Sequence, residues 1–398
     1  MTEPAADHRA YRLSSIDMVR GLAIVVMALD HVRDFFLRGA ALDPISHAGI
    51  DAGLFATRWI THFCAPVFVL LAGTSAGLMT ARKSRTELAR LLFTRGVWLI
   101  FIECSVVSTS FTFSPGGIAQ IGGHVLIVMQ VIWAIGVSMV VLSFAQLLGR
   151  RACLTLGIVI VAGHNLLDAV WPSGGLFEEQ WPLWVALHSQ MAYRAGPFLF
   201  IFVYPLLPWV GVIMLGFGVA GVFELPQDRR NTILLRTGIA LTLGFLLLRA
   251  FDSYGDPYVW HRQRVATATV MDFLHTTKYP PSLAFLLMTL GPASVICAFA
   301  DHMNGFFKET LVMYGRVPFA FYVPHFFLIH ALSVALGMAQ GFGAGQLMTM
   351  FFYYPKGYGV GLPGVYIVWM LVVVTLYPFC RWVAAVKARR RDWWLSYL

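Results

Sequence analysis

Long apolar stretches, separated by short polar connections, make up most of the chain. About ten of them have the roughly 20 residues that a helix needs to cross the hydrocarbon core of a bilayer. They are Ile16–Phe36, Leu54–Leu78, Leu91–Phe111, Val125–Leu147, Cys153–Trp171, Pro197–Phe223, Ile233–Phe251, Ser282–Ala300, Leu311–Met338 and Pro363–Val386. This pattern predicts an all-α, polytopic integral membrane helical bundle of about ten transmembrane helices.

The same pattern leaves little room for a separate soluble domain. We expect residues 1–398 to form one transmembrane domain, with a polar N-terminal segment at 1–14 and a basic tail at 387–398. The first apolar stretch lacks a small-residue cleavage site, so we expect an uncleaved first helix rather than a removed signal peptide.

Composition supports a membrane protein. Of 398 residues, 58% are hydrophobic and only 12% are charged, whereas soluble domains carry about twice that charge. The net charge of +9 would suggest nucleic-acid binding in a soluble chain. Here the basic residues cluster at the ends of the apolar segments, so no nucleic-acid partner is expected. The five cysteines form no C-x-x-C pair, and we predict neither a disulfide framework nor a metal site.

Lysine and arginine are concentrated in alternate connections. The N-terminal segment, the second-to-third connection at 82–90 and the C-terminal tail are all basic, and so are the connections with Arg150, Arg229 and Lys308. The positive-inside rule then places both termini in the cytoplasm, in agreement with an even number of helices.

The first helix carries a polar stripe. At helical spacing, one face presents Asp17, Arg20, Ile24, Met27, His31 and Asp34. Ionisable side chains within hydrocarbon are costly and usually face a protein interior or a watery cavity. Asp30 and Asp34 flank His31, and a neighbouring carboxylate can orient an imidazole and fix its tautomer. His31 with Asp30 or Asp34 is therefore a candidate general base.

Two further histidines are predicted at the depth of His31. His62 and His330 lie a few residues from the outer ends of their helices, which places all three imidazoles roughly 8–12 Å below the outer surface. We predict that they line one cavity, with His325 deeper in the membrane. The alternative is that each histidine is a satisfied polar group that ties helices together. Glu103 is expected to pair with an intramembrane arginine or histidine.

Candidate binding residues lie at both ends of the bundle. Arg20, Arg95 and Arg316 are predicted to line a cytoplasmic mouth, because a guanidinium binds phosphate in two-point fashion. On the outer side, the loop Phe251–Pro281 is rich in aromatic residues and contains Lys278 and Tyr279. These aromatic residues form either an interfacial belt or a surface that stacks against a sugar or a lipid headgroup. Lys278, Tyr279 and His325 are the candidate substrate-binding residues.

Several stretches carry a family resemblance. The opening R-L-S-S-I-D-M-V-R-G-L-A-I-V-V-M-A-L-D-H resembles that of the heparan-α-glucosaminide N-acetyltransferase catalytic-domain family, and its bacterial branch resembles nearly the whole chain. Further matching stretches are Thr57–Thr74, K-Y-P-P-S-L at Lys278–Leu283, Tyr314–His330 and Arg389–Leu398. The D-x-x-R-G…H opening is also similar to that of membrane acyltransferases that O-acetylate envelope glycans.

The resemblance implies a donor and an acceptor on opposite sides of the membrane. Acetyl-CoA would bind from the cytoplasm as acyl donor, and a sugar amine or hydroxyl, or a lipid-linked glycan, would accept the acetyl group on the far side. A bacterial inner membrane is the implied location, and a homodimer is allowed. In the eukaryotic lysosomal enzyme the catalytic histidine follows the first helix, where His47 is the nearest positional candidate. His31 instead resembles the histidine of the glycan O-acetyltransferases.

These observations give a mechanistic hypothesis with open alternatives. His31 is ranked first as the base, His62 second and His330 third, with His62 or Thr61 stabilising the oxyanion. His31 either removes the acceptor's proton or attacks the thioester itself. The competing functions are a proton-coupled transporter or permease of a small solute or glycan precursor and a non-enzymatic scaffold. No inverted repeat supports the transporter.

Overall fold

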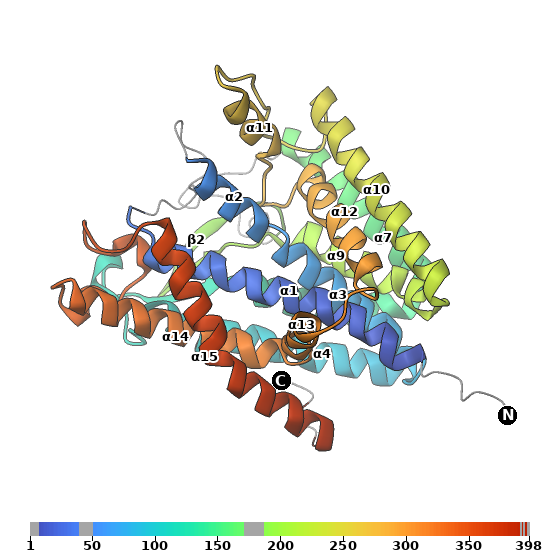
Figure 1. The fold of residues 1–398 in the computed structure, drawn as a ribbon, viewed down its shortest axis with the longest axis horizontal. Coiled ribbons are helices and arrows are strands. Elements are labelled where there is room, and N and C mark those ends of the chain that lie inside the picture. Colours follow the sequence, from blue (N-terminus) through green and yellow to red (C-terminus); the bar gives the residue numbers. More distant parts are fainter. Residues whose placement is uncertain (1–7, 40–50, 171–186, 391, 393–394, 396–398) are drawn as a thin grey trace.

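The computed structural model describes residues 8–39, 51–170, 187–390, 392 and 395. Most of these residues form helices, and a small sheet lies at one side of them (Figure 1). The helices are α1 (His8–Phe36), α2 (Ala52–Thr61), α3 (Cys64–Met79), α4 (Arg85–Ile102), α5 (Ser108–Thr112), α6 (Val131–Ala145), α7 (Arg150–Gly163), α9 (Leu206–Val219), α10 (Gln227–Phe251), α11 (Ala266–Leu274), α12 (Leu283–Phe299), α13 (Phe306–Arg316), α14 (Pro318–Ala339) and α15 (Leu362–Arg389). The strands are β1 (Val125–Met129), β2 (Met191–Ala195) and β3 (Phe198–Phe202).

The predicted polytopic helical fold is confirmed. Within the described ranges, eight helical segments are long and apolar enough to cross a membrane, and each overlaps one predicted span. They are Ala52–Met79, Arg85–Thr112, Val131–Leu148, Arg150–Ala169, Leu206–Glu224, Gln227–Phe251, Pro318–Ala339 and Leu362–Arg389. The other two predicted spans correspond to α1, which carries several charged residues over its 29 positions, and to α12, which has 17 residues.

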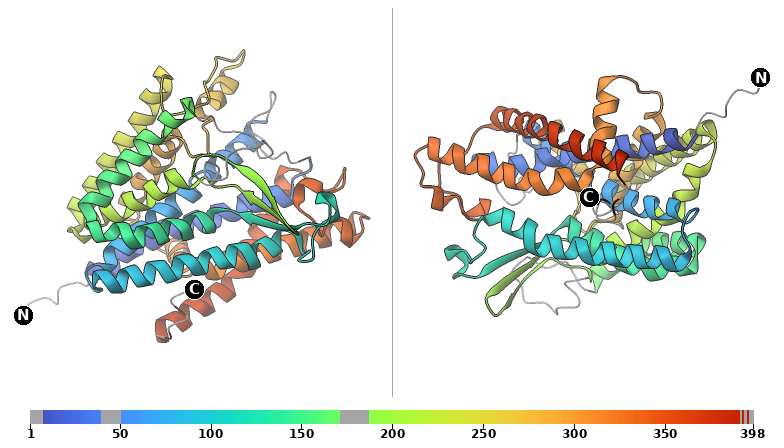
Figure 2. Two further views of the ribbon diagram at one scale, coloured as in Figure 1. Left: turned by 180° about the vertical axis from the view of Figure 1, so that it is seen from behind. Right: turned by 90° about the horizontal axis from the view of Figure 1, so that it is seen from below.

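Two predicted helices begin as strands instead. The prediction was wrong for the first residues of Val125–Leu147 and Pro197–Phe223, which form β1 and β3. Strand β3 lies between β1, to which it is parallel, and β2, to which it is antiparallel. Both runs, V-L-I-V-M and F-L-F-I-F, are rich in β-branched and aromatic residues that favour strands. The strands lie together beside the helices (Figure 2).

A tight hairpin joins β2 to β3. Ala195 pairs with Phe198, so Gly196 and Pro197 alone form the turn. Gly196 has a φ of +55°, a conformation that glycine adopts at little cost and that two-residue hairpins commonly need. This turn fixes the register of a strand pair that forms one wall of the cavity described below.

The predicted span Leu311–Met338 is two helices rather than one. Helix α13 ends at Arg316, Val317 has φ −130° and ψ 50°, and Pro318 begins α14. Proline suits a first helical position because its missing N–H would have no helical partner there. The break places Arg316 at a helix end, where its side chain is 60% exposed.

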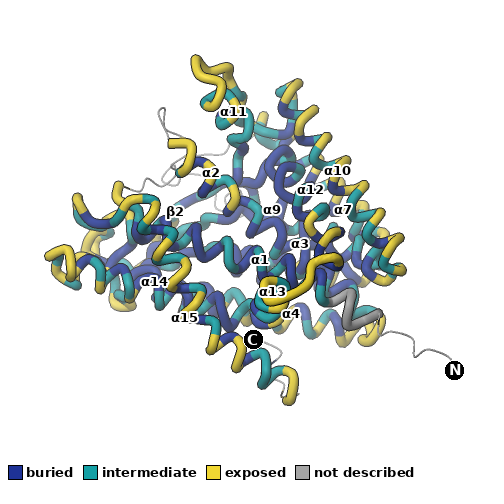
Figure 3. Tube along the Cα trace, viewed as in Figure 1, coloured by how far each residue is buried: buried dark blue, intermediate teal, exposed yellow. Residues whose placement is uncertain are grey.

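Helix α1 is the centre of the packing. It contacts α2, α3, α12, α13, α14 and α15, and much of its length is buried (Figure 3). Its closest neighbour is α13: a Cβ added at Gly21 would lie 1.8 Å from the Leu311 carbonyl oxygen, and one at Gly315 would lie 1.8 Å from the Asp17 carbonyl oxygen. Small residues allow such close helix crossings in membrane proteins.

Two of the basic connections, the one at 82–90 and the one with Arg150, lie at the same end of the bundle. Arg150 donates from Nη2 to the Gly77 carbonyl at 2.7 Å, and Gln146 donates from Nε2 to the Arg85 carbonyl at 2.9 Å. These bonds bring together the ends of α3, α4, α6 and α7. The arrangement agrees with the alternation of basic connections, while the cytoplasmic location of this end stays a prediction.

Candidate functional site

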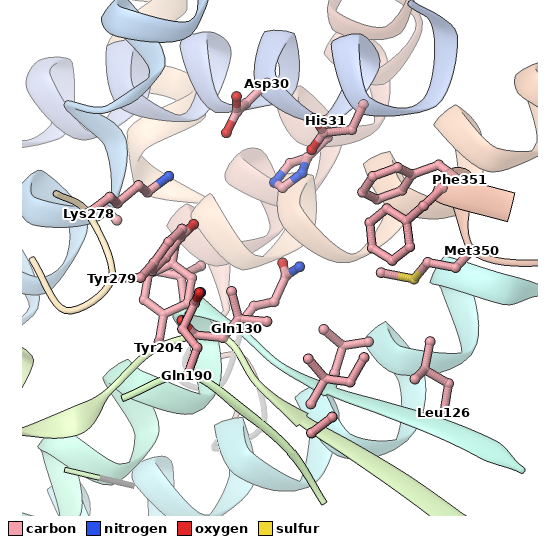
Figure 4. A pocket seen from close by; sticks show the side chains of 18 of the residues that line it. Asp30, His31, Leu126, Gln130, Gln190, Tyr204, Lys278, Tyr279, Met350 and Phe351 are labelled. Carbon is pink, nitrogen blue, oxygen red and sulfur yellow. The ribbon is translucent and has the colours of Figure 1, made fainter. Parts of the chain in front are cut away.

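A cavity of about 1140 Å³ opens between α1, the start of α3 and the sheet. Its walls include Met27, Asp30 and His31 of α1, together with Arg58 and Thr61 of α2. The opposite wall comes from all three strands and from the segments that contain Gln130, Gln190, Tyr204, Lys278, Tyr279, Met350 and Phe351 (Figure 4). Residues far apart in the sequence therefore meet around one space large enough for a sugar.

His31 projects into this cavity (Figure 4). One side of its ring packs against Phe326, with ring centroids 4.3 Å apart, and against His325 at 5.3 Å. Among the described residues, no side chain or backbone group forms a hydrogen bond with the His31 ring. The aromatic contacts hold the ring while its nitrogens remain available to a bound molecule, as general acid–base chemistry requires.

The carboxylate of Asp30 does not orient His31, contrary to the prediction. Arg58 Nη1 lies 2.8 Å from both of its oxygens, Arg33 Nη1 lies 2.9 Å from Oδ1, and the Thr61 hydroxyl donates to Oδ1 at 2.9 Å. Charge-assisted bonds from guanidinium groups are stronger than a bond to a neutral ring. Asp30 therefore joins α1 to α2 at the cavity wall.

Asp34 is also paired with an arginine. Its Oδ1 lies 2.5 Å from Arg33 Nη2, and the side chain of Arg33 is only 2% exposed. Asp34 lines the cavity beside His31, but the prediction that it orients the imidazole is wrong. Arg33 pairs with Asp30 and Asp34 and holds both carboxylates in place.

Of the three predicted histidines, only His31 reaches the cavity. His62 is buried against Phe285, with ring centroids 5.4 Å apart. The ring nitrogens of His330 hydrogen-bond with the carbonyls of Ser110 at 2.7 Å and Leu347 at 2.8 Å. The prediction of one shared cavity is therefore wrong for His62 and His330, because both rings are used in packing helices and loops together. No observation of the structure supports their predicted catalytic roles.

Of the predicted substrate-binding residues, two line the cavity and one does not. Lys278 and Tyr279 line the cavity, whereas His325 is fully buried behind His31 and its Nδ1 hydrogen-bonds with the carbonyl of Tyr322. His325 therefore supports the His31 ring rather than facing a substrate. Thr61, the alternative oxyanion donor, lines the cavity but donates to Asp30 and to the Arg58 carbonyl.

Asp256 holds the segment that carries Lys278. Its carboxylate accepts hydrogen bonds from the Thr277 backbone N–H at 3.0 Å, the Thr277 hydroxyl at 2.7 Å and the Ser282 hydroxyl at 2.7 Å. Both ends of the K-Y-P-P-S run are thus tied to one side chain. This arrangement places Lys278 and Tyr279 firmly at the cavity wall.

A second, smaller cavity of about 180 Å³ adjoins the first. Met27, Phe68 and Val131 line both spaces, and the rest of the smaller one is mostly apolar. Arg20 lies on its wall, and the guanidinium bonds to Asp17 Oδ1 at 3.0 Å and to the Ser75 hydroxyl at 2.9 Å. The two cavities together follow the polar stripe of α1 from Arg20 to Asp34.

The three predicted arginines form part of one basic cluster. Arg316 Nε lies 3.5 Å from Asp17 Oδ2, the same carboxylate that binds Arg20. Lys387 donates to the Arg316 carbonyl at 3.2 Å and lies within electrostatic range of Arg95 and Arg20. Arg20, Arg95, Arg316 and Lys387 are called the basic cluster below. Lys387 was assigned only to the basic tail, although it lies in the last turn of α15.

Among the described residues, neither an arginine nor a histidine pairs with Glu103, contrary to the prediction. It is fully buried in the π-helical turn Glu103–Val107, and its Oε1 accepts the backbone N–H of Gln130 at 3.1 Å. Within the part of the chain that the structure describes, no group of three or more His, Cys, Asp or Glu side chains could hold a metal ion. His47 lies outside the described residues.

Comparison with known proteins identifies the family. Residues 12–246 match the family described as heparan-alpha-glucosaminide N-acetyltransferase, catalytic, and no curated protein matches the chain. The match includes most of α1 with His31, the cavity arginines Arg33, Arg58 and Arg194, and the whole sheet. It covers more than half of the 398 residues, and the domain is that of a membrane acetyltransferase. The chain therefore belongs to the heparan-alpha-glucosaminide N-acetyltransferase catalytic-domain family.

Proposed function

We propose that this protein transfers the acetyl group of cytosolic acetyl-CoA to a sugar amine or hydroxyl in the larger cavity, with His31 as the general base. One observation carries the proposal: the imidazole of His31 faces a large cavity and forms no hydrogen bond with any described residue. A base must be free to meet the proton that it removes. His62 and His330 do not satisfy this requirement.

The donor approaches through the smaller cavity. The basic cluster of Arg20, Arg95, Arg316 and Lys387 offers guanidinium and ammonium groups for the phosphates of CoA. The apolar walls around Met27, Phe68 and Val131 suit the uncharged arm that ends in the thioester. These three residues line both spaces, and in this proposal the thioester passes between the two cavities beside them.

In the first route the acetyl group passes directly from the CoA thioester to the acceptor. The acceptor nitrogen or oxygen bonds to the acetyl carbon, the carbon–sulfur bond breaks, and His31 takes the proton from the acceptor. The imidazolium then returns this proton to the departing CoA thiolate. In the alternative route the His31 ring attacks the thioester first and carries the acetyl group to the acceptor. Both routes use the same free ring.

The remaining parts of the proposal concern location and partners. A lipid bilayer surrounds the helices, and we propose the inner membrane of a bacterium, with a sugar or a lipid-linked glycan as acceptor. A homodimer stays a prediction from the family resemblance.

The test is acetyl-CoA-dependent product formation by the purified protein in lipid nanodiscs. Radiolabelled acetyl-CoA should bind saturably, free CoA should compete, and label should appear on an amino sugar such as glucosamine or on a sugar hydroxyl. Incubation without acceptor separates the two routes, since only an acyl-enzyme retains label after denaturation. Solute flux into vesicles without any dependence on CoA would instead support the transporter and contradict the proposal.

A further inference from the structure

Lys278 is a buried cation that faces the larger cavity. Its residue is only 8% exposed, and Figure 4 shows the side chain reaching from the cavity wall into the open space. Among the described residues, no hydrogen bond or ion pair reaches its Nζ, and its recorded contact is the Tyr279 ring, 5.2 Å away. A buried ammonium that no anion contacts directly is costly unless a ligand supplies the contact.

The carboxylates of the cavity are already occupied. Asp30 binds Arg58 and Arg33, and Asp34 binds Arg33. Two guanidinium groups therefore match two carboxylates, and Lys278 remains as excess positive charge. Arg194 of β2 adds another cation at the rim. The cavity as a whole attracts anions. Lys278 lies within electrostatic range of Asp30, but among the described side chains none forms a hydrogen bond or a close ion pair with it.

The surroundings of Lys278 suit a sugar ring. Tyr279 and Tyr204 stand at the same wall, with ring centroids 5.1 Å apart in an edge-to-face arrangement. Aromatic side chains give a sugar an apolar surface and place a hydroxyl at its edge. Because Asp256 holds both ends of the segment, Lys278 meets a ligand without first having to be ordered.

We propose that the larger cavity binds an acidic sugar, whose carboxylate or phosphate pairs with Lys278 while its amine or hydroxyl faces His31. The inference rests on the proposed function only in treating this cavity as the acceptor site. Lys278 is then a specificity residue. It recognises the charged group of the acceptor and takes no part in the proton transfer.

The experiment measures binding rather than turnover. Purified protein in nanodiscs is titrated with glucuronic acid, with glucose 6-phosphate and with the neutral methyl glucoside at constant ionic strength. Thermal stabilisation reports the affinity. At least one acid should bind the wild type, and Lys278→Gln should weaken that binding by tenfold or more. Lys278→Arg should retain most of the affinity, because it keeps the charge. Lys356→Gln is the matched control, since this lysine is exposed.

The outcomes separate the acid site from the proposed reaction. Binding of glucuronic acid alone assigns a carboxylate, and binding of glucose 6-phosphate alone assigns a phosphate. Equal binding of methyl glucoside, unchanged acid binding by Lys278→Gln, or no acid binding by the wild type overturns the inference. Acetyl-CoA binding is measured on the same samples. If acids bind and acetyl-CoA does not, the acid site stands and the proposed function fails. If the protein acetylates neutral acceptors and no acidic ones, the proposed function stands and the acid site fails.

Discussion

The carboxylate of Asp30 forms ion pairs with Arg33 of α1 and Arg58 of α2, and it accepts a hydrogen bond from the Thr61 hydroxyl. The pairs are largely buried, with side-chain exposures of 2% for Arg33, 8% for Arg58 and 13% for Asp30. Removing one partner of a buried ion pair leaves the others uncompensated. At the scale of single residues, Asp30 is therefore a structural anchor that lies next to the candidate base.

Asp30→Asn should destabilise the protein without abolishing its chemistry. We expect the free energy of unfolding to fall by about 3–5 kcal/mol, the usual cost of breaking a buried pair, while the folded fraction still turns over acetyl-CoA. Unfolding by denaturant and turnover per folded molecule are the two measurements. Loss of turnover with unchanged stability would instead give Asp30 a direct catalytic part.

The sequence predicted the face of α1 that lines the cavities, but only part of what surrounds it. The stripe with Arg20, Met27 and His31 does line the two adjoining cavities. Sequence spacing could not show that Asp30 pairs with Arg58, because Arg58 belongs to another helix. Arg33 was within reach of such reasoning, since it lies three residues after Asp30 and can pair with it on one helix. The prediction that His62 and His330 line the cavity rested on their depth in the membrane. Side chains at equal depth need not face the same space.

At the scale of elements, the crossing of α1 and α13 holds the basic cluster together. Gly21 and Gly315 allow backbone contact, and beside them Asp17 binds both Arg20 and Arg316. A side chain at this crossing must push the helices apart, because the atoms that it meets are backbone atoms.

Gly21→Ala should therefore destabilise the fold by about 1–3 kcal/mol or more, the usual cost of overpacking. The comparison is Gly244→Ala in α10, where the nearest atom to an added Cβ is Leu287 Cδ1 at 3.7 Å. That contact is an ordinary one, so the control should keep or slightly raise the stability, since alanine favours a helix more than glycine does. Thermal unfolding in nanodiscs measures both variants, and equal stability for the two would contradict the close crossing.

The outer segment that contains α11 depends on Asp272. Burial by itself raises the pKa of Asp272, but hydrogen bonds from the Tyr258 hydroxyl, the Gln263 amide and the His261 N–H outweigh it and lower the pKa below its ordinary value of 3.8. Burial and the bond to Asp272 raise the pKa of Tyr258 to about 12, so its hydroxyl stays a donor at neutral pH. These bonds tie α11 to the chain around Tyr258.

Acid should loosen this segment. A carboxylate whose pKa is lowered by folding contributes stability that is complete above 3.8 and is lost as the pH falls through the lower folded value. The protection of residues 252–282 from hydrogen exchange, measured relative to the intrinsic exchange rate at each pH, should therefore fall at acid pH. In Tyr258→Phe this protection should already be lower at neutral pH and should depend less on acid. Identical pH dependence in both proteins would exclude the role of Asp272.

Among the elements, helices were easier to predict than strands. Eight predicted spans correspond to helices that are long and apolar enough to cross a membrane, because length and hydropathy are enough to recognise such a segment. The predicted helical spans included the residues of β1 and β3, because a short apolar run has no periodicity that separates a strand from a helix. Their composition was the available signal, together with Pro197 before the second run. Pro318 likewise marked the start of α14.

At the scale of the whole molecule, the two adjoining cavities are the proposed donor and acceptor sites. One begins near the basic cluster and the other contains His31 and Lys278, and Met27 lies on the walls of both. A donor and an acceptor could thus meet from different ends of one protein.

Met27→Trp should narrow the junction between the cavities. We expect a lower kcat/KM for acetyl-CoA with little change in acidic-sugar binding, because the larger cavity keeps its polar wall. Met27→Leu is the matched control, since a swap of similar volume is usually tolerated. Steady-state kinetics with varied acetyl-CoA provides the comparison. An unchanged kcat/KM in folded Met27→Trp would show that the donor uses another route.

The most direct measurement of the central claim is acetyl transfer by His31→Gln compared with His261→Gln, whose imidazole is exposed. Glutamine keeps much of the volume of histidine but cannot act as a base at neutral pH. The account predicts that His31→Gln folds, still binds acetyl-CoA and loses turnover by at least the 10²-fold typical of a general base, while His261→Gln retains it. Wild-type turnover in folded His31→Gln would contradict the account.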